Sequence, residues 1–328
     1  MVKVVKVYEC GGTEKLKSED VEVGKPGPNQ AKVKHTAIGL NLIDTLFRRG
    51  LYKTDLPFTP GMEGAGIVEE VGSDVTVVKV GDRVCYAGGA LGAYAEERLI
   101  AADGLVKIPD GVDDVTAAAI ILKGMTTQIL IHKAFKVEKG QTILVHAAAG
   151  GVGSLMVQWA SSIGATVIGC VSTEEKAKKA KEDGAQHVIL YSDKNLVQRV
   201  KEITNGVGVS VVYDAVGKDT FQDSLDCLAF RGMLVLYGQA SGPPEPVPVF
   251  ALAARSLFLT RPILMHYTRT REELEEVSND VFANVANGVL KIRVHGVYPL
   301  SQAAKAHEDL EGRKTTGSTV FIPDSLYK

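Results

Sequence analysis

The sequence predicts an α/β protein built from a strand-rich domain and a domain with a doubly wound parallel sheet. Up to about residue 120, short β-branched runs alternate with turns rich in glycine and proline. From Gln141 onward, strands alternate with helices, which is typical of right-handed βαβ units. After Pro262 the tail returns to a long helix, a strand, a helix and a closing strand.

The first part is expected to be antiparallel and partly barrel-like. Its opening, MVKVVKVYEC, alternates valine with lysine as a strand does. Further strands are predicted at 31–40, 65–72 and 80–87, where β-branched residues lie between turn residues. Residues 113–134 then show apolar side chains at a period near 3.6 residues, which predicts a helix.

The second part is predicted to be a parallel sheet covered by helices. Strands are expected at 142–148, 165–171, 187–191, 210–217, 232–238 and 256–262, and helices at 150–164, 172–184, 194–206 and 220–230. Ser172 and Glu175 have the spacing of a capping box at the start of the second helix.

The tail is predicted to contain helices at 270–288 and 301–312 and strands at 291–300 and 317–323. Because no long linker or low-complexity tract precedes it, we expect the tail to pack back on the first domain. The predicted division is therefore one domain of residues 1–123 and 262–328 with an inserted domain of residues 124–261. The cleft between two such domains is the expected ligand site.

Charge and hydropathy exclude several classes of protein. The 328 residues include 37 Lys and Arg against 39 Asp and Glu, a formal charge of -2, so no electrostatic attraction favours nucleic acid or an anionic membrane. The N-terminus lacks the apolar core of a signal peptide. No apolar run is expected to approach the ~18 residues of a membrane span.

The four cysteines, Cys10, Cys85, Cys170 and Cys227, lie far apart and form no C-x-x-C pair. This spacing argues against a disulfide framework and against a structural zinc lobe. A reducing compartment, by default the cytoplasm, is the expected location.

The stretch HAAAGGVGSLMVQWA at 146–160 resembles the G-x-G-x-x-G dinucleotide fingerprint, although Ala148 stands where the first glycine belongs. The stretch follows an apolar strand and opens an apolar helix, which is the setting such a fingerprint requires. Gly150 and Gly151 would allow close approach of a pyrophosphate, and Gly153 close packing of helix on strand. Alanine can replace the first glycine if its φ stays negative.

The residues that follow the next strand favour NADPH over NADH. An NAD site usually carries an acid about 20 residues after the fingerprint, but Ser172 and Thr173 stand there and Glu174 is the first acid. A hydroxyl with Lys176 and Tyr191 suits a 2′-phosphate. The alternatives are a helix-capping serine and a solvated lysine.

The chain resembles the quinone oxidoreductase (zeta-crystallin-like) family of medium-chain reductases, in particular its compact bacterial-type members. The resemblance rests on GQTILVHAAAGGVGSLMVQWAS, GLNLIDTLFRRGLY, PGMEGAGIVEEVG, LKGMTTQ, VVYDAVGKDTF and GSTVFIP, spread over nearly the whole chain. It implies a GroES-like, partly open β-barrel catalytic domain (1–123 and 262–328) and a Rossmann dinucleotide-binding domain (124–261).

Departures from the zinc-dependent alcohol dehydrogenases imply chemistry without a metal. Where those enzymes carry a zinc-ligand cysteine, this chain reads N-L-I-D at 41–44, and it has G-M-E at 61–63 in place of G-H-E. A zinc site needs about three or four nearby ligands. With no Lewis acid to polarise an alcohol, reduction of an electron-poor quinone or enone is expected instead.

The resemblance also implies site residues. Asn41, Asp44 and Tyr52 are expected to line the nicotinamide and substrate end of the site. The expected cofactor-binding residues are Asn41, Thr127, Ala149, Gly150, Gly151, Val152, Gly153, Ser172, Thr173, Lys176, Tyr191, Tyr237 and Gly238. Asp44 could instead be a buried structural acid, Tyr52 an aromatic wall and Gly238 a plain turn. His146 and Asp214 are expected to be structural.

The expected activity is NADPH-dependent quinone reduction, with hydride transferred in the interdomain cleft. Reduction of α,β-unsaturated aldehydes or ketones is the alternative within the enzymes. A non-catalytic structural or RNA-binding relative is the alternative from another class, and the intact cofactor motifs and the lack of a basic stripe argue against it. The resemblance implies a homodimer joined through the sheet edge near 240–260, although SGPPEPVPVF could equally be a surface loop.

Overall fold

The computed structural model describes residues 1–327, which form two compact units. The first unit contains residues 1–125 and 268–286 and the chain from 292 onward. The second contains residues 126–267 and the short segment 287–291.

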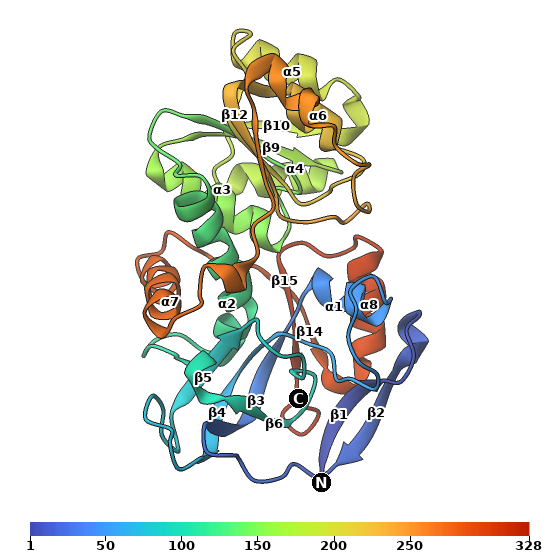
Figure 1. The fold of residues 1–328 in the computed structure, drawn as a ribbon, viewed down its shortest axis with the longest axis vertical. Coiled ribbons are helices and arrows are strands. Elements are labelled where there is room, and N and C mark those ends of the chain that lie inside the picture. The colour runs from blue at the N-terminus through green and yellow to red at the C-terminus, as the bar shows by residue number, and fades with distance from the viewer. Residues whose placement is uncertain (328) are drawn as a thin grey trace. The chain divides into compact units, whose positions relative to one another are not determined.

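The first unit is built on a sheet with strand order β14-β15-β3-β4-β5-β7, and β6 also pairs with β3. Its strands are β3 (Gln30–Leu40), β4 (Glu63–Val71), β5 (Arg83–Ala87), β6 (Glu97–Ala101), β7 (Val106–Lys107), β14 (Val294–Pro299) and β15 (Ser318–Ile322). A separate antiparallel pair joins β1 (Val2–Val7) and β2 (Leu16–Val21), drawn in blue in Figure 1.

The tail of the chain completes this sheet. β15, near the C-terminus, runs antiparallel to β3, with Val320 opposite Gly39, and β14 runs parallel to β15. Val33, Ile38 and Phe321 meet in the buried core of the unit. The prediction that the tail packs on the first domain is therefore confirmed.

Helices of the first unit are α1 (Leu42–Arg48), α7 (Arg271–Ala286) and α8 (Ala303–Glu311), with short 3-10 turns at Thr13–Lys15, Ala102–Gly104 and Leu300–Gln302. The chain passes into the second unit within α2 (Asp114–Gln128), which continues as a π-helical segment, Ile129–Ala134.

The second unit is a six-stranded parallel sheet of order β10-β9-β8-β11-β12-β13. Figure 1 labels β9, β10 and β12 of this sheet. Its strands are β8 (Thr142–Val145), β9 (Thr166–Val171), β10 (His187–Leu190), β11 (Val209–Asp214), β12 (Leu228–Leu236) and β13 (Phe258–Thr260). Its helices are α3 (Gly151–Ile163), α4 (Glu174–Glu182), α5 (Leu196–Ile203) and α6 (Phe221–Asp226), and 3-10 turns lie at Tyr191–Asp193, Val249–Arg255 and Leu264–His266. This order reverses direction between β8 and β11, as in a doubly wound Rossmann sheet, and confirms the predicted fold class.

Two local predictions are wrong. The helix expected at 220–230 ends at Asp226, because the chain from Leu228 onward pairs with β11 as strand β12. The N-cap of α4 is Thr173, whose hydroxyl accepts from the Lys176 amide, so Ser172 and Glu175 form no capping box. Pairing with a neighbouring strand outweighs local helix preference in the first case.

One helical segment is more apolar than expected. Asp114–Ala134 has 21 residues, and its most apolar 18-residue window has a mean hydropathy of 1.3, enough in length and composition to cross a membrane, so the expectation that no run approaches this length is wrong. Some 72% of its most apolar window is buried inside the structure, as in the core helix of a globular protein.

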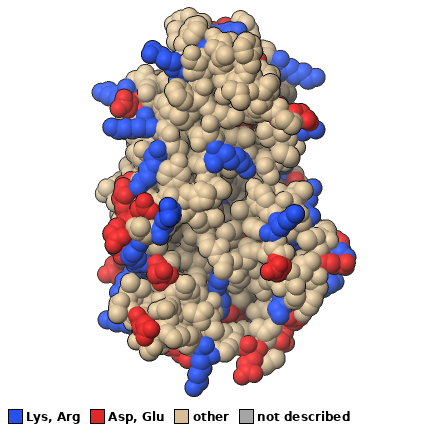
Figure 2. Space-filling view, viewed as in Figure 1, with Lys and Arg blue, Asp and Glu red and all other residues tan. Residues whose placement is uncertain are grey.

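Basic and acidic side chains are interspersed on the molecular face in Figure 2. Charged side chains also form ion pairs, such as Lys32 with Glu70 and Arg271 with Glu275. Surface pairs of this kind contribute little to stability.

Candidate active site

The fingerprint turn lies at the carboxyl end of β8, beside the point where the strand order reverses. A Cβ on Gly153 would lie 2.2 Å from the Ala147 carbonyl oxygen, and one on Gly150 would lie 3.1 Å from it. Glycine at 153 is therefore imposed by the carbonyl that packs against it.

Ala148 is compatible with the turn because it is not among the residues with a positive φ. The left-handed residue is its neighbour Ala147, with a φ of 50°. The Ala148 side chain is buried, and its Cβ lies 2.9 Å from the position that a Cβ on Gly169 would take. The missing glycine is thus replaced by an alanine that packs on β9.

The start of α3 fits a bound phosphate. Its N-cap is Gly150, which has no side chain to satisfy the amides of the first turn. Such amides, at the positive end of the helix dipole, bind phosphate in dinucleotide sites. Thr127, fully buried, donates from Oγ1 to the Val152 carbonyl at 3.5 Å, so this predicted residue meets the fingerprint helix. Ala149 is also buried beside this turn.

Ser172, Thr173 and Lys176 cluster where β9 leads into α4. Ser172 is exposed and Lys176 is half-buried. The Thr173 hydroxyl accepts from the Lys176 backbone amide at 3.2 Å and so fixes the first turn of α4. The structure therefore brings three of the residues predicted for a 2′-phosphate to one helix end.

Tyr191 follows β10 and turns its hydroxyl toward the fingerprint turn, 3.0 Å from both the Ala147 amide nitrogen and His146 Nδ1. Tyr237 and Gly238 follow β12, and their amides donate to the Asp214 carbonyl. A Cβ on Gly238 would lie 2.5 Å from the Ala215 carbonyl oxygen, so close backbone packing explains this glycine.

In the first unit, Asn41 is the N-cap of α1 and its side chain is held by a buried ion pair. Asn41 Nδ2 donates to Glu63 Oε2 at 2.8 Å, and Lys123 Nζ donates to the same oxygen at 2.9 Å. Glu63 Oε1 accepts from the Leu122 amide at 2.7 Å. Sequence reasoning missed Lys123, although a lysine inside the apolar run IILKGM was a signal that it has a buried partner.

Asp44 is fully buried one turn into α1. Its Oδ2 accepts from the Asn41 amide at 2.9 Å and from the Tyr94 hydroxyl at 3.1 Å, and Oδ1 has no partner in the structure. Burial raises the pKa of Asp44 to about 7, although the two hydrogen bonds act in the opposite direction. Asp44 therefore gains or loses its proton near neutral pH.

Tyr94 also meets His307, which meets Arg48. Tyr94 Oη lies 2.9 Å from His307 Nε2, and Arg48 donates from NH1 to His307 Nδ1 at 2.9 Å. Burial, followed by the Arg48 charge, lowers the pKa of His307 to about 3, so the ring is neutral. Nδ1 accepts from Arg48, which leaves the ring proton on Nε2, directed at Tyr94.

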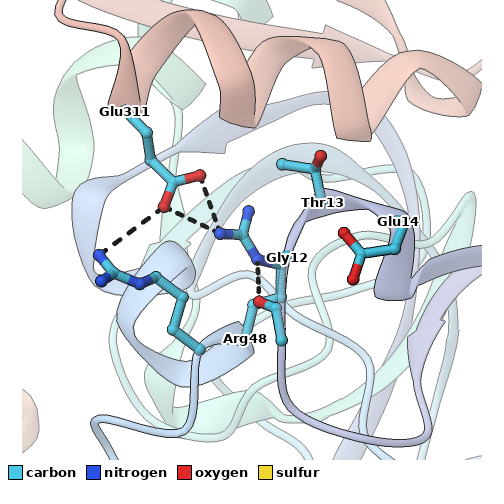
Figure 3. Close-up of a pocket in the computed structure, with 7 residues that line it drawn as sticks. Gly12, Thr13, Glu14, Arg48 and Glu311 are labelled. Carbon is cyan, nitrogen blue, oxygen red and sulfur yellow. Dashed lines mark hydrogen bonds and ion pairs between the residues drawn. The ribbon is translucent and has the colours of Figure 1, made fainter.

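Arg48 connects this chain of hydrogen bonds to the surface. Both of its contacts to the Glu311 carboxylate are 2.8 Å, and its Nε donates to the Gly11 carbonyl. Figure 3 shows this ion pair at a surface pocket. The pocket is lined by Gly11, Gly12, Thr13, Glu14, Arg48, Arg49 and Glu311.

Comparisons with known proteins identify the family. The alcohol dehydrogenase GroES-like domain matches residues 27–110, and the zinc-binding dehydrogenase model matches residues 151–281. The quinone oxidoreductase of Pseudomonas aeruginosa is 48% identical over 325 residues, covering 98% of this chain and all (100%) of that protein. The chain belongs to the quinone oxidoreductase family.

Two further proteins are similar to this chain over their full length. The crystal structure of Escherichia coli quinone oxidoreductase complexed with NADPH has a TM-score of 0.96 at 45% identity, covering 98% of this chain and 100% of that one. The 2-haloacrylate reductase of a Burkholderia species is 48% identical over 333 residues, covering 99% of this chain and 100% of that protein. The predicted family membership is confirmed.

Tyr52 follows α1 in this member of the quinone oxidoreductase family. It is half-buried after α1, and its ring packs edge-to-face on Phe47 with centroids 5.5 Å apart. The structure thus joins Asn41 to Asp44 by a hydrogen bond, and Tyr52 packs on Phe47 of the same helix.

The zinc-binding dehydrogenase model matches this chain, but the described residues form no zinc ligand set. Across residues 1–327, no group of three or more His, Cys, Asp and Glu side chains is placed to hold a metal ion. Glu63, the acid of the G-M-E stretch, is instead paired with Lys123, Asn41 and a backbone amide.

Proposed function

We propose that the protein reduces quinones with NADPH in the cytoplasm. The observation that supports this most directly is the fingerprint turn, which carries Gly150 and Gly153 at the strand-order reversal of a Rossmann sheet. The full-length similarity to quinone oxidoreductases, one solved with NADPH, supports the same conclusion.

We assign the cofactor to residues of the second unit. The α3 amides would bind the pyrophosphate, and Ser172, Thr173 and Lys176 would bind the 2′-phosphate. NADPH supplies the hydride, and the chain's role is to orient it and to exclude water. Residues 124–261 are the proposed dinucleotide-binding domain, and residues 1–123 and 262–328 the catalytic domain.

Asn41, Asp44 and Tyr52 are the proposed residues of the substrate end. Glu63 holds the Asn41 amide in one orientation, so Asn41 can offer a fixed hydrogen bond to charge that develops on the acceptor oxygen. Hydride transfer to a quinone leaves a quinolate anion, which takes its proton from Tyr52 or readily from water.

Reduction of an α,β-unsaturated carbonyl compound is the second candidate. The Burkholderia relative named 2-haloacrylate reductase, 48% identical over the whole chain, favours it. The two activities share the same hydride donor and differ in the electrophile.

Steady-state oxidation of NADPH against a panel of acceptors separates these functions. We expect turnover with 1,4-benzoquinone and 9,10-phenanthrenequinone, unchanged after exhaustive chelation. Faster turnover of 2-chloroacrylate or a 2-alkenal would assign the second function. If NADPH is oxidised with none of the acceptors, the protein is a non-catalytic relative, which would contradict our proposal.

We also propose that the protein is a homodimer. Strand β13 is an edge of the parallel sheet. Near it along the chain, Val249, Phe250 and Phe258 are 82%, 86% and 55% exposed. A second copy pairing with this edge would cover apolar side chains that water otherwise contacts.

A further inference from the structure

A buried ion pair contacts Asn41 in the first unit. Lys123 Nζ donates to Glu63 Oε2 at 2.9 Å, and Asn41 Nδ2 donates to the same oxygen at 2.8 Å. Both charged side chains are buried. A Cβ on Gly39 would lie 2.1 Å from Glu63 Oε2, so glycine at this position of β3 leaves the room that the carboxylate occupies beside Asn41.

Stability alone gives no reason for this pair. Removing a carboxylate and an ammonium group from water is costly, and apolar side chains of similar volume often stabilise a protein as well or better. A buried charge can instead fix the direction of a polar group that touches it. The polar group that touches the Glu63–Lys123 pair is the side-chain amide of Asn41.

The hydrogen bonds of Glu63 determine which way the Asn41 amide faces. Glu63 Oε1 accepts from the Leu122 amide at 2.7 Å, and Oε2 accepts from Asn41 and Lys123. A carboxylate only accepts hydrogen bonds, so the atom of the Asn41 amide that faces it must be the nitrogen. The Asn41 oxygen then faces the Asp44 amide in the capping box of α1.

One hydrogen of the Asn41 nitrogen is left for a ligand. The nitrogen carries two hydrogens, and Glu63 accepts one of them. Among residues 1–327 the structure gives the second hydrogen no acceptor, and Asn41 keeps 6% of its surface exposed. Asn41 therefore presents a donor to an incoming molecule. A carbonyl oxygen that gains negative charge during hydride transfer is the group that such a donor stabilises.

We propose that Lys123 is a positioning residue for this reaction: its ammonium balances the buried Glu63 carboxylate, which in turn holds Asn41 with one N–H directed at the acceptor oxygen. The inference rests on the proposed function and deepens it, because it assigns the polarity of the substrate end. Quinones and α,β-unsaturated carbonyl compounds both offer an oxygen to such a donor. A molecule that presents a hydrogen-bond donor at this point is disfavoured.

The variants Lys123→Met and Glu63→Gln each put a donor where Asn41 now meets an acceptor. The Leu122 amide still needs an acceptor, so in Glu63→Gln the new oxygen faces Leu122 and the new NH2 group faces Asn41. In Lys123→Met the buried carboxylate has lost its cation and binds a proton, which for the same reason lies on the oxygen that faces Asn41. In both variants the Asn41 amide must turn over and present its oxygen to the ligand.

We expect each single variant to lower kcat with 1,4-benzoquinone about tenfold or more. Each should also lower the melting temperature by about 5 °C or more, because one buried charge has lost its partner. The dissociation constant for NADPH, measured by isothermal titration, should stay within about twofold of the wild-type value. Lys32→Met is the matched control. It removes a lysine of the same unit that pairs with Glu70 at 3.0 Å, and it should leave kcat unchanged.

The double variant Lys123→Met with Glu63→Gln separates positioning from stability. It buries no unpaired charge, so its melting temperature should return to within about 2 °C of the wild-type value. Its kcat should stay reduced, because the carboxylate that orients Asn41 is still missing. Lys123→Met added to Asn41→Ala should lower kcat no further than Asn41→Ala alone, because Lys123 acts through Asn41.

Three results would overturn the inference. The first is a double variant that recovers kcat together with its melting temperature, which would make the pair purely structural. The second is a further loss of kcat when Lys123→Met is added to Asn41→Ala. The third is an unchanged nuclear magnetic resonance signal of the Asn41 side-chain amide in Lys123→Met.

That signal is measured on protein with isotope-labelled asparagine and without cofactor, and it is assigned by its loss in Asn41→Ala. It should move in Lys123→Met and stay in place in Lys32→Met. A wild-type protein that oxidises NADPH with no acceptor would refute the proposed function instead. The Asn41 signal would then still judge whether Lys123 orients the amide, because it does not depend on turnover.

Discussion

At the scale of single residues, Asp44 couples the proposed substrate end to pH. It is fully buried, and its pKa is raised from 3.8 to about 7. Between pH 3.8 and about pH 7, the Asp44 carboxyl is protonated in the folded protein and ionised in the unfolded chain. The free energy of unfolding therefore falls as pH rises through this window.

Asp44→Asn should remove this pH dependence. Asparagine cannot ionise, but its amide oxygen can still accept the hydrogen bonds from the Asn41 amide and the Tyr94 hydroxyl. Urea unfolding gives the free energy of unfolding of both proteins at about pH 5 and about pH 8. The wild-type value minus the variant value should be about 3 kcal/mol lower at the higher pH. A difference that stays constant with pH would show that Asp44 has an ordinary pKa.

Lys176 should decide between the two dinucleotides. Lys176→Ala is expected to raise the Michaelis constant for NADPH about tenfold or more, and that for NADH about twofold or less, because only NADPH carries the 2′-phosphate. Lys178→Ala is the control, since it removes a lysine from the same helix two positions on. Equal effects of Lys176→Ala on both cofactors would refute the assignment.

The sequence was informative about residues within a motif and silent about contacts between distant ones. Gly150 and Gly153 were found because their spacing is local. Glu63 and Lys123 meet although 60 residues separate them. Tyr94 and His307 meet across 213 residues. The hydrophobic periodicity of a sequence does not reveal such pairs, because their residues meet only in the folded protein.

At the scale of elements, the junction of β8 and α3 leaves no room for a side chain at Gly153. Gly153→Ala should therefore shift the turn, lower the free energy of unfolding by about 1–3 kcal/mol and weaken NADPH binding. Gly104→Ala is the matched control, because a Cβ there meets no atom within 4 Å. Calorimetry and cofactor titration measure both effects, and a Gly153→Ala protein with wild-type affinity would contradict the packing argument.

Most elements followed from periodicity, and the errors lie at their ends. Leu228 falls within the helix predicted at 220–230, yet it pairs with β11 as the first residue of β12. Thr173, rather than Ser172, caps α4. Adjacent hydroxyl residues have similar capping preferences, so only the backbone direction after β9 distinguishes them.

At the scale of the whole molecule, the alternation of strands and helices predicts a parallel sheet. It does not predict the order of the strands, which only the folded structure shows. The absence of a linker predicts that the tail packs on the first domain, and the pairing of β15 with β3 is seen only in the structure. The grouping of residues 287–291 with the second unit was not foreseen. A segment this short carries no periodic signal of its own.

Association should depend on the exposed edge near β13. Phe250→Asp combined with Phe258→Asp is expected to convert a dimer into a monomer, because a charge on each apolar contact would have to be buried. Analytical ultracentrifugation of both proteins measures this. Phe230→Asp is the control, since Phe230 is 73% exposed on β12. A wild-type monomer, or a variant that stays dimeric, would contradict the proposed interface.

The central claim is tested most directly by single-turnover stopped flow at 340 nm with 1,4-benzoquinone as acceptor. The account predicts rapid oxidation of bound NADPH, oxidation of NADH at least about tenfold less efficient, and no effect of prior chelation. A protein that binds NADPH but leaves it unoxidised, or that uses NADH equally well, would contradict it.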